Sequence, residues 1–216
     1  MDKLRVNIGC GQTPTAGWRN FDNSPSLRLS NLPLVPVFLR KIGLINKDQA
    51  SFIQFAREHS IEYGDATRCL PLQSGSVDVL YSSHMLEHLD QQEVVLFLRE
   101  ARRILWSGGI IRLAVPDIRM QAEKYIATND ADAFVESTRM TAPRPRTLSK
   151  RLGILLVGTR NHQWMYDGLS LSRLLETQGF VSPRILKAGE TQINAPQNLD
   201  LYERAEESVY VEAVYP

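Results

Sequence analysis

Two glycines and an acid near the N-terminus have the types and spacing to hold a nucleoside. The apolar residues of 4–8 are followed directly by Gly9, a cysteine and Gly11. A strand that runs into glycines brings its backbone close to a ligand without side chains in the way. A second run, 18–21, ends on Asp22, and a carboxylate at a strand end beside a glycine loop suits the two hydroxyls of a ribose. These residues predict a nucleoside site, with an ordinary tight turn as the alternative.

The amino-acid sequence of this loop argues against a dinucleotide as the ligand. The fingerprint G-x-G-x-x-G places its third glycine where helix meets strand and seats a pyrophosphate on the helix N-terminus. Here Gly11 is followed by the residues QTP, and Asp22 comes only 13 positions after Gly9 instead of about 20. S-adenosylmethionine has no phosphate and needs no such helix end, so it remains compatible with this loop.

Polar residues recur wherever an expected strand ends. After Gly9 and Asp22 come Asp65, the serines and histidine of 82–84, and Asp117, each directly behind an apolar run. The alternation of strands and helices predicts an α/β fold with a parallel sheet and helices on both faces. Ligands of such sheets lie at the carboxyl ends of the strands. We therefore expect these polar residues to gather at one edge.

Periodicity and caps define the other elements. Asp90, with Glu93 three positions later, forms a capping-box pair, and apolar residues then recur at helical spacing until the residues SGG at 107–109, which are expected to end the helix. Further helices are expected at 27–44, 47–59, 117–127, 130–137, 148–157 and up to 179, and further strands at 61–63, 77–81, 110–115, 181–186 and 209–214.

Length and composition indicate one soluble domain spanning residues 1–216. The chain is 43% hydrophobic and 23% charged, with a net charge of +1, so nothing points to a nucleic-acid partner. Its two cysteines form neither a disulfide framework nor a zinc spacing, and the first residues lack the apolar segment of a signal peptide. A cytoplasmic location is expected, and the oligomeric state is not predicted.

Two helical insertions are expected, at about 27–60 and 118–162. The first contains leucines beside basic residues at 27–44, which suits a membrane surface, although packing over the sheet or forming a lid is favoured. The second contains a basic stretch at 139–151. That stretch suits a phosphate or a nucleotide-sugar, although a solvated face is favoured.

The spacing H-x-x-E-H at His84, Glu87 and His88 is also the zinc-ligand spacing of one class of metalloprotease. Such an enzyme needs these residues in the middle of a helix, where they share one face. Here they follow a strand directly and precede the helix cap at Asp90. We therefore expect no metal ion, and structural hydrogen bonding by Glu87 and His88 under the end of the sheet.

Five motifs in order resemble the class I S-adenosylmethionine-dependent methyltransferases of the broad type 11 group. They are VNIGCG, the acid of NFD, GDA, LPLQSGSVDVLYSSHMLEHL and LREARRILWSGGIIRLAVPD, which together cover residues 4–117. The later passages NHQWMYDGLSLSRLLETQGF and SVYVEA are similar to a subset of bacterial members that often occur near glycan-biosynthesis genes. The resemblance implies a Rossmann-like, seven-stranded, mostly parallel sheet whose last strand is antiparallel.

The resemblance also implies roles for the cofactor-side residues. Gly9 and Gly11 let the backbone approach the methionine moiety and the ribose, and Asp22 binds the ribose hydroxyls. Asp65 accepts from the adenine amino group, and the Ala66 amide reaches a ring nitrogen.

On the acceptor side the resemblance implies that Ser82 and His84 lie near the sulfonium and the acceptor. A hydroxyl acceptor benefits from a base, and histidine titrates in the useful range, so His84 and then His162 are the catalytic candidates. The loop after the first strand is too short for the family's usual first helix. Gln12 or Arg19 is therefore expected to replace the backbone donors for the cofactor's carboxylate.

These observations predict an enzyme that transfers a methyl group from S-adenosylmethionine, leaving S-adenosylhomocysteine, to a small-molecule or sugar-containing acceptor. A hydroxyl of a glycan precursor is the expected acceptor group. Residues 164–166 are the candidate wall of its site, although a core position is favoured for Trp164 and Tyr166. Two alternatives stay open: an NAD-dependent oxidoreductase on a related sheet, and a cofactor-binding protein without turnover.

Overall fold

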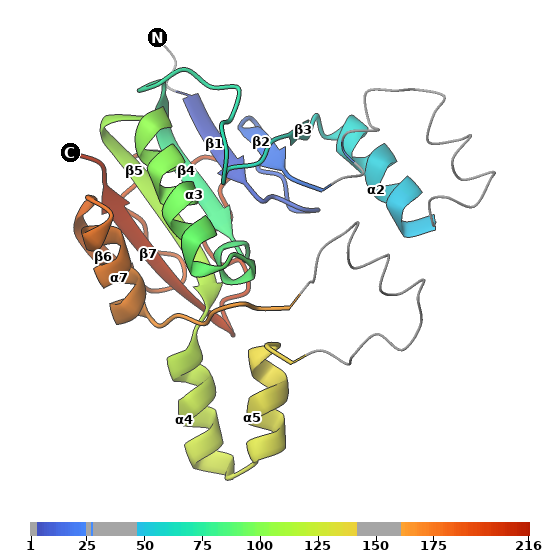
Figure 1. Cartoon of the computed structure of the whole chain (residues 1–216), viewed down its shortest axis with the longest axis vertical. Coiled ribbons are helices and arrows are strands. Elements are labelled where there is room, and N and C mark those ends of the chain that lie inside the picture. Colours follow the sequence, from blue (N-terminus) through green and yellow to red (C-terminus); the bar gives the residue numbers. More distant parts are fainter. Residues whose placement is uncertain (1–3, 25–26, 28–46, 142–160) are drawn as a thin grey trace.

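The computed structural model describes residues 4–24, 27, 47–141 and 161–216. Among these residues, seven strands form one sheet (Figure 1). The strands are β1 (Leu4–Ile8), β2 (Arg19–Asp22), β3 (Glu62–Tyr63), β4 (Val77–Ser83), β5 (Leu105–Pro116), β6 (Val181–Leu186) and β7 (Ser208–Val214).

The sheet has the order β3-β2-β1-β4-β5-β7-β6. Strands β1 to β5 pair in parallel, whereas β7 is antiparallel to both β5 and β6. Strand order reverses between β1 and β4, which is where open α/β sheets bind their ligands. The helices are α2 (Lys47–Glu58), the 3-10 turn η2 (Leu86–His88), α3 (Gln91–Ile104), α4 (Ile118–Thr128), α5 (Ala131–Thr138) and α7 (Gly168–Thr177).

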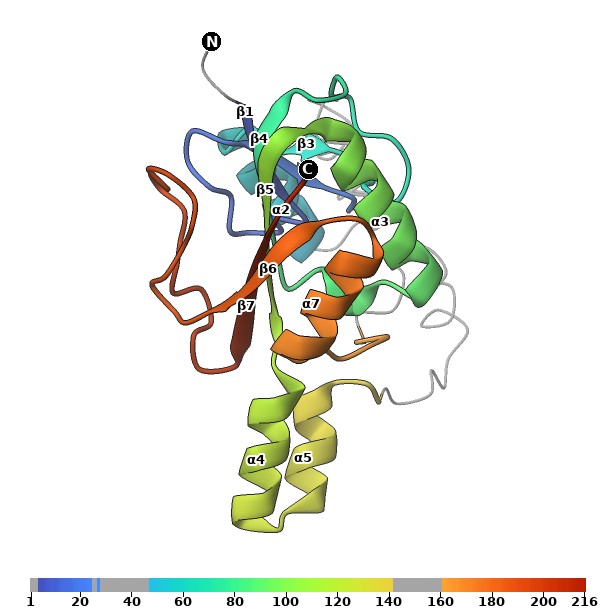
Figure 2. The ribbon, with the colours of Figure 1, turned by 90° about the vertical axis from the view of Figure 1, so that its left-hand side faces the viewer.

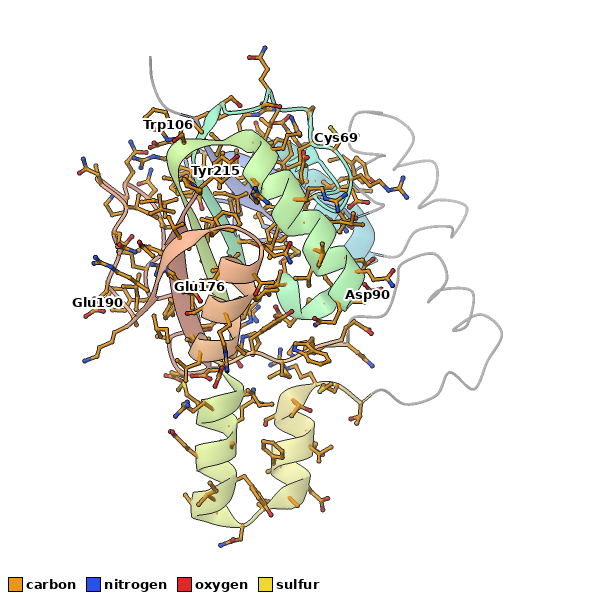
Figure 3. The ribbon with its side chains drawn as sticks, turned by 60° about the vertical axis from the view of Figure 1, so that its left-hand side comes forward. Cys69, Asp90, Trp106, Glu176, Glu190 and Tyr215 are labelled. Carbon is orange, nitrogen blue, oxygen red and sulfur yellow. The ribbon has the colours of Figure 1, made fainter. Side chains whose placement is uncertain are left out.

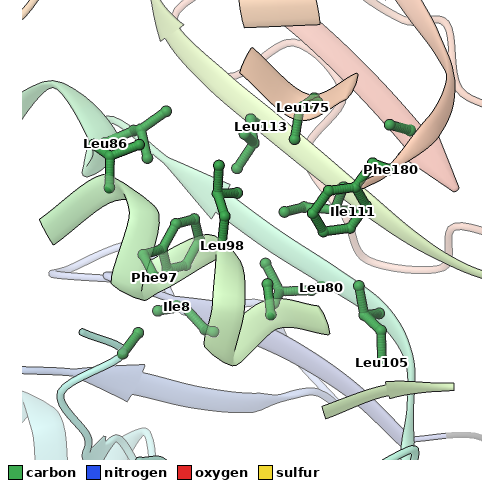
Figure 4. Packing of buried hydrophobic residues seen from close by; sticks show 14 of the residues in the cluster. Ile8, Leu80, Leu86, Phe97, Leu98, Leu105, Ile111, Leu113, Leu175 and Phe180 are labelled. Carbon is green, nitrogen blue, oxygen red and sulfur yellow. The ribbon is translucent and has the colours of Figure 1, made fainter. Parts of the chain in front are cut away.

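Helices α3 and α7 cover one face of the sheet (Figure 2). Phe97 of α3 and Leu175 of α7 are fully buried, and they belong to the same core cluster as Leu80 of β4 and Leu113 of β5 (Figure 4). Asp90, at the start of α3 (Figure 3), forms the expected capping box with Glu93. The amphipathic helix predicted from the sequence is therefore confirmed, and its apolar face forms the core.

The opposite face of β4, β5 and β7 is covered by the segment that joins β6 to β7. In this segment Ile193 and Leu199 are buried, and they share a cluster with Tyr81, Ala114 and Tyr210 of the sheet. Figure 2 shows this segment on the side of the sheet away from α3 and α7.

A buried ion pair fixes that segment to the sheet. Arg112 of β5 donates to the carboxylate of Glu212 on β7 over 2.7 Å, and neither side chain is exposed. The same carboxylate accepts from the hydroxyl of Thr191 and the amide of Gln192, each at 2.6 Å. Arg112 also donates to the carbonyl of Glu190, a residue labelled in Figure 3. The ion pair and its backbone partners therefore fix the start of the long connection to β5 and β7, although Nε and Nη2 of Arg112 have no hydrogen-bond partner among the described residues.

Helices α4 and α5 form a hairpin that extends beyond the end of the sheet (Figures 1 and 2). Asp117 and Asp130 cap the two helices, and Asn129 ends α4 in a left-handed conformation. The rings of Tyr125 and Phe134 lie 5.5 Å apart between the helices. Both helices match the sequence prediction to within one residue at each end.

The structure confirms the fold class and corrects several boundaries. Strand β5 begins at Leu105, directly after α3, instead of at Ile110, and the residues SGG lie inside it. Ser82 lies within β4 rather than behind it. The helix expected at 27–44, apart from Leu27, and the helix expected at 148–157 lie outside the described residues, and the single-domain division with its two insertions stays a prediction.

No helix in the described part of the chain is both long enough and apolar enough to cross a membrane.

Candidate cofactor and acceptor site

The loop after β1 requires glycine at its first position. Gly9 has φ of +72°, and a β-carbon added there would lie 2.5 Å from Cγ of Met85. Its amide donates to the carbonyl of Phe21 over 2.8 Å, which closes the loop onto β2. Gly11 has φ of +51° with nothing within 4 Å of an added β-carbon. The backbone at Gly11 is therefore open to a ligand, while that at Gly9 is packed.

Two buried asparagines hold this loop in place of a helix. Residues 9–18, all of which the structure describes, run as turns from β1 to β2. Asn7 donates to the carbonyl of Thr13 and the hydroxyl of Thr15, each at 3.1 Å. Asn20 accepts from the amide of Thr15 over 2.8 Å and donates to its carbonyl. The sequence analysis missed both asparagines, although two polar residues inside apolar strands signal buried hydrogen bonds.

Asp22 lies at the end of β2 and faces the glycine loop. One carboxylate oxygen accepts from the Gly11 amide over 3.1 Å, and the other accepts from the Ser24 amide over 2.8 Å. Burial raises the pKa of Asp22, although these two amides act in the opposite direction. A carboxylate has about four acceptor positions, so Asp22 retains capacity for two hydroxyl donors. The structure thus brings Gly11 and Asp22 together as predicted.

Asp65 lies beside Asp22, one strand further along. The amide of Gly64 donates to the Asp22 carbonyl over 3.0 Å, which places the turn after β3 against the end of β2. One carboxylate oxygen of Asp65 accepts from the amide and the hydroxyl of Thr67, at 3.0 and 2.6 Å. Ala66 is buried, with 7% of its surface exposed.

Arg19 is not available to a ligand, which contradicts the expectation that it replaces missing donors. Its guanidinium makes two hydrogen bonds to the carboxylate of Glu62 on β3, at 2.7 and 2.6 Å. The hydrogen bond to Glu62 raises the pKa of Arg19 further. Gln12 is exposed and stays a candidate.

Glu203 reaches this loop from the segment between β6 and β7. Its carboxylate accepts from the Tyr81 hydroxyl over 2.6 Å and from the Thr13 hydroxyl over 3.3 Å. Sequence reasoning missed Glu203 because it lies 190 positions from Thr13, and no local spacing connects the two.

Ser82 and His84 lie at the end of β4. Ser82 is 2% exposed, and its hydroxyl has no hydrogen-bond partner among the described residues. His84 has φ of +49°, and its ring lies between two protein groups. Nε2 lies 2.8 Å from the Ser208 hydroxyl, and Nδ1 lies 3.4 Å from a Glu87 carboxylate oxygen. Both ring nitrogens of His84 therefore already face the protein.

Glu87 lies below this histidine in the turn η2. Its side chain is fully buried, and neither carboxylate oxygen makes a hydrogen bond to any described residue. Structural hydrogen bonding was expected of Glu87 and His88: the Glu87 carboxylate makes none with the described residues, whereas Nδ1 of His88 lies 3.3 Å from the carbonyl of Asn161. The Glu87 carbonyl, by contrast, accepts from the amide of Gln163 over 2.6 Å.

His162 is brought to Glu87 by the segment that precedes α7. Its Nε2 lies 4.0 Å from a Glu87 oxygen, and its ring meets that of His88 edge to face at 5.1 Å. Burial lowers the pKa of His162, although the charge of Glu87 acts in the opposite direction. The two predicted catalytic histidines, His84 and His162, thus lie on two sides of one buried carboxylate.

The segment 161–166 lies across the ends of β4 and β5. Tyr166 pairs with Asp117 in an isolated parallel bridge. Tyr166 and Met165 are buried, at 3% and 8% exposure, whereas Trp164 is 48% exposed. Of the three residues expected to line an acceptor site, only Trp164 presents an open ring.

Comparisons with known proteins agree with this fold. Residues 37–113 match the family model described as a methyltransferase domain. A SAM-dependent methyltransferase from Thermotoga maritima, described as a possible histamine N-methyltransferase, is 14% identical with a TM-score of 0.52, covering 100% of this chain and 84% of that one. A SAM-dependent methyltransferase from Methanosarcina mazei is 15% identical with a TM-score of 0.53, covering 99% and 92%. No curated protein matches the sequence.

The residues that the family model matches lie at the centre of the sheet. The matched residues include β4, α3 and most of β5, the strand-helix-strand passage at the centre of the sheet. The two similar structures share the fold across nearly the whole chain. Residues 37–113 therefore match the methyltransferase-domain family, and the chain as a whole has the fold of the two S-adenosylmethionine-dependent methyltransferases to which it is similar.

Proposed function

We propose that the protein binds S-adenosylmethionine across the carboxyl ends of β1 to β4 and methylates a small-molecule acceptor. The observation that carries this proposal is the Asp22 carboxylate, held by the Gly11 and Ser24 amides at the end of β2 with acceptor capacity to spare. A hydroxyl on a sugar or glycan precursor is the acceptor group we favour.

The residues present fit the cofactor. When bound, S-adenosylmethionine supplies an electrophilic methyl group on a positively charged sulfur. Asp22 accepts from both ribose hydroxyls. The second oxygen of Asp65, which lies 3.4 Å from Nε of the exposed Arg68, accepts from the adenine amino group. The Ala66 amide donates to a ring nitrogen, and the open backbone at Gly11 lies along the ribose and methionine.

Glu203 takes the ammonium group of the methionine moiety in this proposal. Its carboxylate already accepts from Thr13, two positions beyond Gly11. A carboxylate there attracts a cation and repels the cofactor's own carboxylate, which fixes the direction of the methionine chain. Gln12 is the donor we assign to that carboxylate.

Catalysis then rests chiefly on positioning, because the reaction is an in-line displacement between bound partners. Ser82, buried and without a described partner, lies at the strand end where cofactor and acceptor meet. Proton transfer to His84 or His162 stays a prediction. Since both nitrogens of His84 face protein groups, the role we favour for it is to position Glu87 and Ser208.

We favour S-adenosylmethionine over a nicotinamide dinucleotide as the cofactor. Residues 9–18 are all described and contain no helix, so the N-terminus that would seat a pyrophosphate is missing. Titration of the purified protein with S-adenosylhomocysteine, with NADH in parallel, tests the choice. Methyl-transfer assays with tritiated cofactor and glycan precursors then separate an enzyme from a binding protein without turnover.

A further inference from the structure

Three potential metal-binding side chains meet behind β4. Glu87 and His88 come from the turn η2, and His162 comes from the segment before α7. One ligand atom from each residue can be chosen such that all three lie within 4.8 Å of one another. The H-x-x-E-H spacing pointed to His84 as the partner of Glu87 and His88, whereas the fold supplies His162.

Glu87 is the feature that needs an explanation. Other buried acids of this chain have donors: Glu100 accepts from the Leu70 amide and from Arg103, and Glu212 from Arg112. Glu87 is fully buried, yet neither oxygen makes a hydrogen bond to a described residue. Burying a carboxylate without hydrogen-bond donors is unfavourable, and the nearest histidine nitrogens are Nδ1 of His84 at 3.4 Å and Nε2 of His162 at 4.0 Å. A bound cation would remove that cost.

The two histidines are oriented to serve as ligands. Nδ1 of His88 lies 3.3 Å from the carbonyl of Asn161, so a proton on Nδ1 leaves Nε2 with a free lone pair. Nδ1 of His162 lies 3.3 Å from the sulfur of Met165, and its Nε2 faces Glu87. Such outer contacts set the tautomer of metal-binding histidines.

We propose that Glu87, His88 and His162 bind one divalent transition-metal ion, zinc or an ion of similar ligand preference. Two imidazoles and one carboxylate suit such ions. Ligand atoms about 2.1 Å from a common ion lie about 3.4 Å apart, so the side chains must close by about 1 Å. Side-chain rotation can supply that change.

Three protein ligands leave at least one coordination position open. The turn η2 follows Met85, whose side chain packs against Gly9 at the glycine loop. The cluster thus adjoins the turn that packs on the glycine loop, and in this proposal an oxygen of the acceptor or a water fills the open position. This last step rests on the proposed function, whereas metal binding itself does not.

The test uses the tag-free full-length protein, stripped with EDTA and reconstituted separately with Zn²⁺, Mn²⁺ and Co²⁺. Metal content after gel filtration should approach one ion per chain, and Co²⁺ should give visible absorption bands of a site with nitrogen ligands. Glu87→Gln, which keeps the side-chain shape, and His162→Ala should each weaken metal affinity at least tenfold. His59→Ala, at an exposed histidine directly after α2, is the matched control and should bind metal normally.

Thermal unfolding gives a second readout. Metal should raise the Tm of the wild type but not of Glu87→Gln. Because Glu87→Gln removes a buried charge that no hydrogen bond from a described residue stabilises, its metal-free Tm should equal or exceed that of the metal-free wild type. Absence of stoichiometric binding of all three metals, or equal binding by Glu87→Gln and His59→Ala, would overturn the site. S-adenosylhomocysteine affinity, measured on the same samples, separates this outcome from failure of the proposed function.

Discussion

The most informative substitution at the cofactor site is Asp22→Asn. It keeps the shape of the side chain and removes the charge that would accept from the ribose hydroxyls. A hydrogen bond to a charged group contributes about 1.5–3 kcal/mol. Two such bonds, at the lower end because neighbouring contacts are not additive, give about 3 kcal/mol, or a loss of about 100-fold in affinity for S-adenosylhomocysteine.

The same substitution has a smaller effect on the fold. In Asp22→Asn one of the two backbone amides, of Gly11 or Ser24, loses its acceptor. Burial disfavours the charged form of Asp22, so the neutral side chain offsets part of that loss. We expect the free energy of unfolding to change by no more than about 1–2 kcal/mol.

Isothermal titration calorimetry with S-adenosylhomocysteine measures the affinity, and thermal unfolding measures the fold. Asp132→Asn, at an exposed position of α5, is the matched control and should bind as the wild type does. Unchanged affinity of a folded Asp22→Asn protein would refute the assignment of Asp22 to the ribose.

Three further predictions concern the same loop. Gly9→Ala should destabilise the protein by about 2–3 kcal/mol, because the residue combines a positive φ with a clash against Met85. The control Gly75→Ala, at a positive φ in open space, should destabilise it by only about 1 kcal/mol. Thermal unfolding compares the two variants, and equal losses of Tm would contradict the prediction. Since the pKa of Asp22 is raised, its charge is lost at a higher pH than that of an ordinary aspartate. As the pH falls, the affinity for S-adenosylhomocysteine should therefore begin to decrease above pH 3.8, the ordinary pKa of an aspartate. An affinity that stays constant down to that pH would count against the role of Asp22. Glu203→Gln should weaken S-adenosylhomocysteine about tenfold and leave 5′-methylthioadenosine, which lacks the ammonium group, unaffected; parallel losses for both ligands would remove Glu203 from this role.

The central part of the fold was predictable because its signals are local. A capping box, helical spacing after Asp90 and glycines behind an apolar run each fix the backbone over a few residues. The start of β5 was not predictable in this way. Val77 pairs with Leu105 and Val79 with Ile110, so the glycine-rich residues between form a bulge within the strand. Their composition is that of a turn, and only pairing on both sides keeps them in the sheet.

The same difference between local and long-range signals applies to the candidate site. Gly11 and Asp22 meet because the carboxyl ends of adjacent parallel strands always meet, and the order of the motifs was enough to predict this. No spacing in the sequence indicates a partner for Arg19, yet its guanidinium donates to the carboxylate of Glu62, 43 positions later. Glu203 and His162 likewise come from distant segments, and no spacing reveals a contact that depends on how a long connection folds back.

A calorimetric titration with two ligands tests whether the glycine loop and Asp22 form a binding site for S-adenosylmethionine. The tag-free full-length protein is titrated with S-adenosylhomocysteine in one calorimeter run and with NADH in another. We expect one-to-one binding of S-adenosylhomocysteine with a micromolar Kd and no heat from NADH. Binding of NADH alone, or of neither ligand, would mean that the glycine loop and Asp22 do not form the cofactor site described above.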